Sequence, residues 1–195
     1  MDTVPTPSQT VGPFFHFCLT TAEHCISCIA GPQTAGERVW LRCQVFDGEG
    51  TPIPDAMIEI WQADAEGRYY SAEDFQDDVQ NNAADPAWRG FGRMATGEDG
   101  SCEFETIRPG RVPGPANVFQ APHLDVAIFA RGMLRQLFTR IYFAGNAANQ
   151  EDPVLNLVPQ ERRETLMAHP DPAHPGHWHF DVHLQGERET VFFDV

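Results

Sequence analysis

The chain has 195 residues, of which 42% are hydrophobic, and its 28 acidic and 13 basic side chains give a formal net charge of −15. A chain of this size can bury a substantial core, and we expect one domain over residues 1–195. The negative charge repels phosphate backbones and anionic lipid surfaces, which argues against nucleic-acid and membrane partners. Residues 1–5 lack a signal-peptide pattern and no apolar run approaches the roughly 20 residues of a membrane span, so we predict a cytoplasmic protein.

Proline dominates the start of the chain, at Pro5, Pro7 and Pro13. Because proline fixes φ and disfavours helix in the residue before it, residues 1–16 are predicted to form an extended arm. The phenylalanines on this arm, together with Trp88 on a later loop, predict an apolar surface that a partner covers.

Residues 39–46 alternate with period two, with Val39, Leu41, Cys43 and Val45 on one face, which is typical of a strand. Further short runs bounded mostly by Gly, Pro or Asp predict strands at 56–62, 91–96, 102–107, 124–129, 136–143, 177–184 and 190–193. Residues 159–168 are predicted to be helical, and residues 71–86 to form a long surface loop. We therefore predict a mainly β protein, a β-sandwich of short antiparallel strands with long loops and one or two short helices.

The chain contains an odd number of cysteines without a regular framework, namely Cys18, Cys25, Cys28, Cys43 and Cys102. Reduced thiols fit this pattern better than disulfides. Cys25 and Cys28 are spaced like half of a structural zinc site, but a second such pair is missing.

Polar side chains recur at every second position of the late predicted strand, at His177, His179, Asp181 and His183. Such a face could in principle bind zinc or nickel, and an independent metalloenzyme using it is one hypothesis. A solvent-facing polar edge explains the same spacing, because the apolar Trp178, Phe180, Val182 and Leu184 then turn inward. We interpret the histidines as this edge.

Four segments carry a resemblance to a known family. They read Thr-Pro-Ser-Gln-Thr-Val-Gly-Pro-Phe-Phe at 6–15, Thr-Ile-Arg-Pro-Gly-Arg-Val-Pro at 106–113, Pro-His-Leu-Asp at 122–125, and Leu-Gln-Gly-Glu at 184–187 followed by Thr-Val-Phe-Phe-Asp at 190–194. Over nearly its whole length the chain resembles the intradiol ring-cleavage dioxygenases. The first and last segments resemble more narrowly the alpha subunit of a two-chain member of that family.

This resemblance implies a ferric site of two tyrosines and two histidines, which the chain lacks. The second histidine of the His-x-His pair is replaced in His123-Leu124-Asp125, the tyrosine expected after the Pro-Gly turn is Val112, and residues 71–93 contain no tyrosine. Val112, His123 and Asp125 are thus vestigial ligand positions, and we expect no metal and no catalytic residue in this chain. Tyr69 and Tyr70 are adjacent and so point apart on an extended strand, and Tyr142 is expected to lie elsewhere, so no tyrosine pair suited to iron is expected. We interpret His123 as a core histidine paired with Asp125, the alternative being a general base.

By resemblance, the chain is an alpha subunit that completes the active site of a homologous beta subunit, which binds the Fe(3+). The pair would open the ring of 3,4-dihydroxybenzoate with O2 to give 3-carboxy-cis,cis-muconate. The resemblance assigns the substrate pocket of this chain to Thr10, Gly12, Pro13 and Arg131, whereas the sequence around Arg131, taken without the resemblance, favours a solvated turn residue. The alternative is a non-catalytic β-sandwich binding or carrier protein on an intradiol scaffold.

Overall fold

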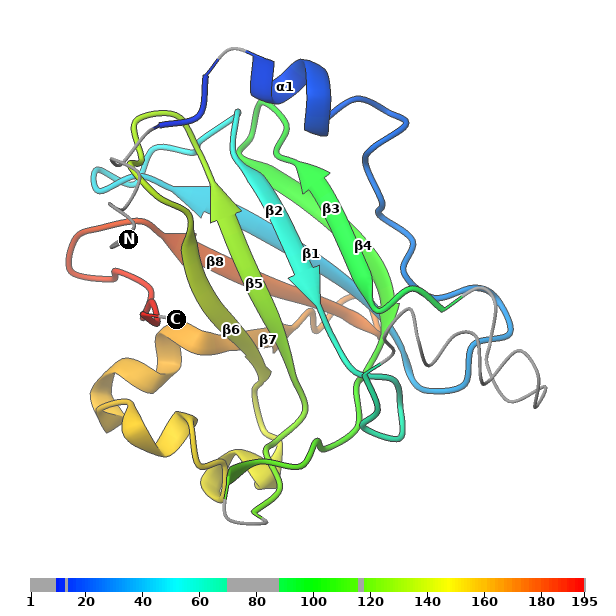
Figure 1. Ribbon diagram of the computed structural model, residues 1–195. Coiled ribbons are helices and arrows are strands. Elements are labelled where there is room, and N and C mark those ends of the chain that lie inside the picture. The colour runs from blue at the N-terminus through cyan, green and yellow to red at the C-terminus, as the bar shows by residue number, and fades with distance from the viewer. Residues whose placement is uncertain (1–9, 13, 70–87, 116–117, 195) are drawn as a thin grey trace, which may run out of the picture.

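The computed structural model describes residues 10–12, 14–69, 88–115 and 118–194 (Figure 1). The predicted loop at 71–86, most of the predicted arm and Pro13 lie outside the described residues.

The described residues form two β layers that share one continuous 8-stranded sheet, with the strand order β3-β2-β5-β6-β7-β8-β1-β4. The strands are β1 Arg38–Phe46, β2 Met57–Trp61, β3 Phe91–Ala95, β4 Ser101–Ile107, β5 His123–Phe129, β6 Leu137–Phe143, β7 Met167–Pro170 and β8 His177–His183. Short β7 pairs with β6 in one layer and with β8 in the other, and so links the two. This confirms the predicted mainly β sandwich, although the β6–β7 and β1–β8 pairs are parallel rather than antiparallel.

The core lies between the layers and follows from the period-two pattern of the strands. In β1, side chains alternate between buried and half-buried, and Val39, Leu41, Cys43 and Val45 are all fully buried, as predicted. Strands β4, β5 and β8 contribute their inward faces to the same cluster. The five cysteines are free thiols, and two of them, Cys43 and Cys102, pair across β1 and β4 inside this core.

An irregular segment, residues 26–29, joins the two outer strands of the sheet. Ile26 exchanges backbone hydrogen bonds with Arg93 of β3, at 2.7 and 3.0 Å. The next residues bond to β4. The carbonyl of Ser27 accepts from the backbone N–H of Glu105 at 2.8 Å, and the N–H of Ile29 donates to the carbonyl of Glu105 at 2.9 Å. The ribbon of strands is therefore closed between β3 and β4.

The helices lie at the two ends of the sandwich (Figure 1). Helix α1, Phe14–Leu19, crosses one end, where the ring of Phe15 lies 6.2 Å from that of Phe129. The 3-10 helices η2 Ala147–Gln150, η3 Leu155–Leu157 and η4 Gln160–Leu166 lie on the β6–β7 connection. Helix α1 corrects the prediction of an extended arm over residues 1–16, because residues 14–16 are helical. Proline disfavours helix in the residue before it but not in the residues after it.

Three other sequence predictions need correction. The helix predicted at 159–168 is real but ends at Leu166, because the next residues form β7. Residues 190–193 form no strand and contribute only the isolated bridge between Phe193 and Phe138. Trp88 is 3% exposed and packs in the core, so it is not available to a partner. No helix among the described residues is long and apolar enough to cross a bilayer.

Candidate functional site

Three of the predicted site residues lie at the two ends of strand β5. His123 and Asp125 lie at its start, while Arg131 lies two residues beyond its last residue, Phe129. At roughly 3.3 Å per residue the two groups are separated by about 20 Å or more. The predicted residues therefore do not converge on one pocket within this chain, and each end is described separately.

We call the group at the start of β5 the remnant site and define it as Val112, His123, Asp125, Arg140 and Tyr142. His123 is 2% exposed, and its Nδ1 donates to the carbonyl of Ala121 at 2.7 Å. Its Nε2 is buried without a hydrogen-bond partner, 3.9 Å from an oxygen of Asp125. Burial first, and then the charge of Arg140, lower the pKa of His123. The lowered pKa favours the neutral imidazole, so His123 lies beside Asp125, as the sequence suggested, without a hydrogen bond to it.

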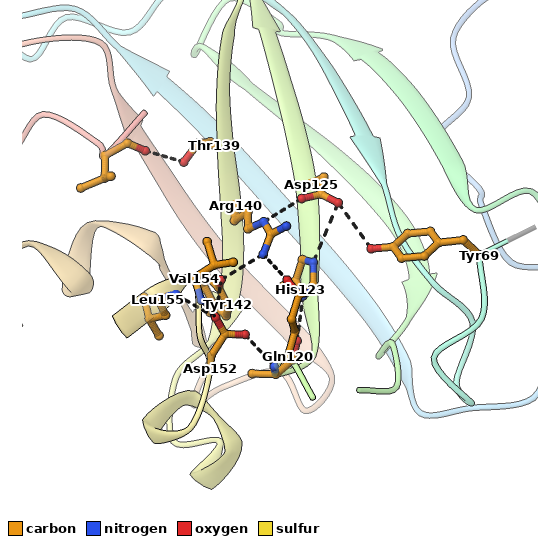
Figure 2. Close-up of polar contacts among 12 residues, drawn as sticks. Tyr69, Gln120, His123, Asp125, Thr139, Arg140, Tyr142, Asp152, Val154 and Leu155 are labelled. Carbon is orange, nitrogen blue, oxygen red and sulfur yellow. Dashed lines mark hydrogen bonds and ion pairs between the residues drawn. The ribbon is translucent and has the colours of Figure 1, made fainter. Parts of the chain in front are cut away.

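Arg140 is the cation of the remnant site (Figure 2). The strand register places it opposite Asp125, and its Nε donates to that carboxylate at 2.9 Å. Its Nη1 donates to Oε1 of Gln120 at 2.7 Å and lies 3.5 Å from the hydroxyl of Tyr142. The hydroxyl of Tyr69 donates to the other oxygen of Asp125 at 3.4 Å. Asp125 is thus neutralised and hydrogen-bonded from both sides.

Tyr142 lies inside the remnant site, which corrects the expectation that it lies elsewhere. It pairs with His123 across β5 and β6, with ring centroids 5.7 Å apart. Its hydroxyl donates to Asp152 at 3.2 Å, and burial raises the pKa of the phenol. Buried Asp152 also accepts backbone hydrogen bonds from Ala121 and Leu155, both at 2.7 Å, so it ties the loop before β5 to η3.

These residues do not fit a ferric ion. Val112 is apolar and 3% exposed, Asp125 already pairs with an arginine, and within the remnant site the one buried polar atom without a hydrogen-bond partner is Nε2 of His123. Tyrosinate ligation needs ionised phenols, whereas the pKa values of Tyr69 and Tyr142 are both raised, chiefly by burial. Among the described residues no group of three or more His, Cys, Asp or Glu side chains is arranged to hold a metal.

We call the group beyond the end of β5 the turn site and define it as Thr10, Asp55, Arg131 and Gly132. Arg131 is 71% exposed in its side chain, and its Nε donates to the carboxylate of Asp55. Gly132 has φ +84°, the left-handed conformation that a type II turn requires at its third residue. Arg131 therefore projects from a tight turn between β5 and β6.

The start of the described chain reaches this same turn. The hydroxyl of Thr10 accepts a hydrogen bond from the backbone N–H of Gly132 at 2.9 Å, across 122 residues of sequence. Gly12 is exposed, and its carbonyl accepts from Phe15 at the start of α1. The structure thus places Thr10 against the residue that follows Arg131, while Pro13 is not among the described residues.

The histidines of β8 do not all face solvent. His179 and Asp181 are exposed, as predicted, but His183 is only 8% exposed and stacks on Phe46 with centroids 5.0 Å apart. His177 stacks on Trp40 at 5.1 Å. The predicted polar edge is therefore wrong for His183, because its ring packs on Phe46 of the neighbouring strand β1 rather than facing solvent.

Sequence reasoning missed Arg140, Asp152 and Asp55. Arg140 and Tyr142 stand two apart in a strand that was predicted, so their shared face was a usable signal. Asp55 carried no such signal, because it follows two prolines in a turn, and only the pairing of β2 with β5 brings it to Arg131.

Comparison with known proteins places the chain in a family. A family model described as Dioxygenase matches residues 11–186. The chain belongs to the intradiol ring-cleavage dioxygenases, a family of oxidoreductases. It is similar over nearly its whole length to the protocatechuate 3,4-dioxygenase alpha chain of Burkholderia cepacia, with 44% identity covering 97% of both chains.

Two further relatives are informative. The protocatechuate 3,4-dioxygenase beta chain of the same organism is 29% identical and covers 94% of this chain and 77% of its own length. Among solved structures, the dioxygenase domain of a dioxygenase carbohydrate-binding fusion from Streptomyces sp. SirexAA-E matches with a TM-score of 0.63 and 27% identity, covering 94% of this chain and 99% of that one. Identity is therefore higher to the alpha chain than to the beta chain.

Proposed function

We propose that the chain is the alpha subunit of a protocatechuate 3,4-dioxygenase and that its turn site forms part of an active site whose iron a beta subunit binds. The observation that carries the proposal is the contrast between the ends of β5. At one end the ligand positions of the family are occupied by an apolar side chain and an arginine–aspartate pair. At the other end an exposed arginine is held on a tight turn beside the start of the chain.

In this proposal, the work of the chain is to bind and orient substrate. A carboxylated catechol is an anion at neutral pH, and a chain of net charge −15 would repel it without a local cation. Arg131 offers donors for the substrate carboxylate, with Thr10, Gly12 and Pro13 as the adjoining wall. The reaction is the ring opening of 3,4-dihydroxybenzoate by O2 to 3-carboxy-cis,cis-muconate, and Fe(3+) bound by the beta subunit supplies the redox chemistry.

Apolar surface near the turn site supports a protein partner. Phe17 on α1 is 72% exposed and Leu134, three residues after Arg131, is 63% exposed. Large exposed apolar side chains close to a functional residue are typical of an interface. A beta chain of related sequence is the partner that the likeness to the Burkholderia cepacia chains suggests.

Co-expression tests the proposal. The chain would be purified alone and together with the homologous beta chain of its own genome, and each sample assayed for 3,4-dihydroxybenzoate cleavage and for iron. We expect a stable complex with activity and iron, and neither in the chain alone. Failure of the two chains to associate, or equal activity of the beta chain without this one, would leave the carrier-protein alternative as the better account.

A further inference from the structure

We infer that Asp55 is a positioning residue for the substrate arginine: it fixes the guanidinium of Arg131 through Nε and leaves the Nη donors for a ligand carboxylate. This inference rests on the proposed function of the turn site. It adds a residue that touches no substrate and acts only through Arg131.

The sheet itself sets up the pair. Strands β2 and β5 are antiparallel with Met57 opposite Phe129. Met57 and Phe129 are the last pair of this ladder, and continuing the same register by two residues leads to Asp55 on one side and Arg131 on the other, in agreement with the side-chain contact between them. Ala56 and Ala130 are both buried, at 0% and 2% exposure, and anchor the two segments in the core. Asp55 therefore lies in a turn whose next residue is anchored in the core.

The side chains of Asp55 and Arg131 differ in exposure, as expected if Asp55 holds Arg131 in place and Arg131 faces the ligand. The side chain of Asp55 is 17% exposed, whereas that of Arg131 is 71% exposed. The contact uses Nε of Arg131, and among the described residues its two Nη groups have no hydrogen-bond partner. A carboxylate approaching from solvent can then meet the two Nη groups side by side, the planar fork that arginine presents to carboxylates.

A long arginine side chain loses considerable rotamer freedom when a ligand fixes it. A residue that restricts the arginine before the ligand binds reduces this loss. For one ordered side chain the loss corresponds to about twofold to tenfold in affinity. The backbone of the turn is restrained as well, because Thr10 accepts from Gly132 at 2.9 Å. Asp55 and Thr10 thus hold the side chain and the main chain of the same turn.

The opposite relation is the main rival, in which Arg131 serves only to neutralise the partly buried carboxylate of Asp55. The two accounts predict opposite changes in substrate binding when Asp55 is replaced. A carboxylate beside the pocket repels an anionic substrate, so its removal should improve binding if charge is its only effect. If Asp55 positions Arg131, its removal should impair binding in spite of the lost repulsion.

The test uses the assembled enzyme with Asp55→Asn, which keeps an acceptor oxygen without the charge, and Asp55→Ala, which removes both. We expect kcat/KM for 3,4-dihydroxybenzoate to fall about twofold to tenfold in Asp55→Ala, mainly through KM, and by less in Asp55→Asn. Catechol, which lacks the carboxylate, should be affected little. Glu151→Gln is the control, since it removes an exposed carboxylate paired with Arg111 at the far end of the molecule.

A double substitution completes the test. If Asp55 acts only through Arg131, then Asp55→Ala should change nothing further in an Arg131→Ala background. An unchanged or increased kcat/KM in the single variants overturns the inference, as does an equal loss for both substrates. A wild-type complex without activity on 3,4-dihydroxybenzoate would instead overturn the proposed function, so the two failures are distinguishable.

Discussion

The rings of His123 and Tyr142 face each other across β5 and β6, 5.7 Å apart, yet their polar atoms point to different partners. His123 donates to the carbonyl of Ala121, and Tyr142 donates to Asp152. The cation close to both is the guanidinium of Arg140. A histidine and a tyrosine can therefore be neighbours in this family's fold and still be engaged in purely structural hydrogen bonds.

The first prediction concerns metal. Ferric iron added to the isolated chain should give no tyrosinate charge-transfer band, because the phenols of Tyr69 and Tyr142 are held protonated and Arg140 already pairs with Asp125. Visible spectroscopy during an iron titration checks this, with the beta chain as the positive control. A stoichiometric coloured complex of the isolated chain would contradict the description of the remnant site.

The second prediction concerns acid. The folded-state pKa of His123 lies below the ordinary value of 6.5, so below that pH the unfolded chain takes up a proton that the folded chain does not. Stability should therefore decrease as the pH falls from about 6.5 toward the lower folded pKa. His183, whose pKa is also lowered by burial first, adds a change of the same sign.

Replacement of His123 by asparagine isolates its share of this effect. The amide can still donate to Ala121 but does not titrate, so the variant should lose less stability than the wild type between neutral and acidic pH. Urea unfolding midpoints across the pH range measure it. His24→Asn, at an exposed position, is the control, and an identical pH dependence in all three proteins would show that His123 is not buried in its neutral form.

The third prediction concerns the substrate arginine. Arg131→Ala in the assembled enzyme should lower kcat/KM for 3,4-dihydroxybenzoate by roughly tenfold to a hundredfold, because a hydrogen bond to a charged group contributes about 1.5 to 3 kcal/mol. Catechol should be affected far less, and iron content should stay normal. Equal losses on both substrates would reduce Arg131 to a structural turn residue.

The fourth prediction concerns assembly. The double variant Phe17→Ser, Leu134→Ser should bind the beta chain more weakly, because both side chains are exposed near the turn site. Leu157→Ser is the matched control, since Leu157 is 82% exposed but lies on η3, at the remnant-site end. Size-exclusion chromatography of the co-expressed chains reads out both. A stronger effect of the Leu157 variant would place the interface at that end.

Local patterns predicted much of this molecule. The alternation of apolar side chains located β1, and a short apolar run located β5, each to within one residue, because one face of each strand packs into the core. The same reasoning failed at β7, whose four residues follow η4 and are strand only because they pair with β6 and β8. Partners distant in sequence were likewise beyond its reach: Asp55 with Arg131, and Asp125 with Arg140, depend on strand register, which a single sequence does not fix.

The closing segment at residues 26–29 has a consequence for how the chain meets other proteins. An outer strand with unpaired backbone groups is a template for intermolecular pairing and aggregation. Here Ile26 bonds to β3, while Ser27 and Ile29 bond to β4, so the same short stretch occupies backbone groups of both outer strands. Strand addition is thereby hindered where this segment covers β3 and β4. Removal of the chain up to residue 29 should convert a selective subunit into a protein that adds strands indiscriminately and precipitates.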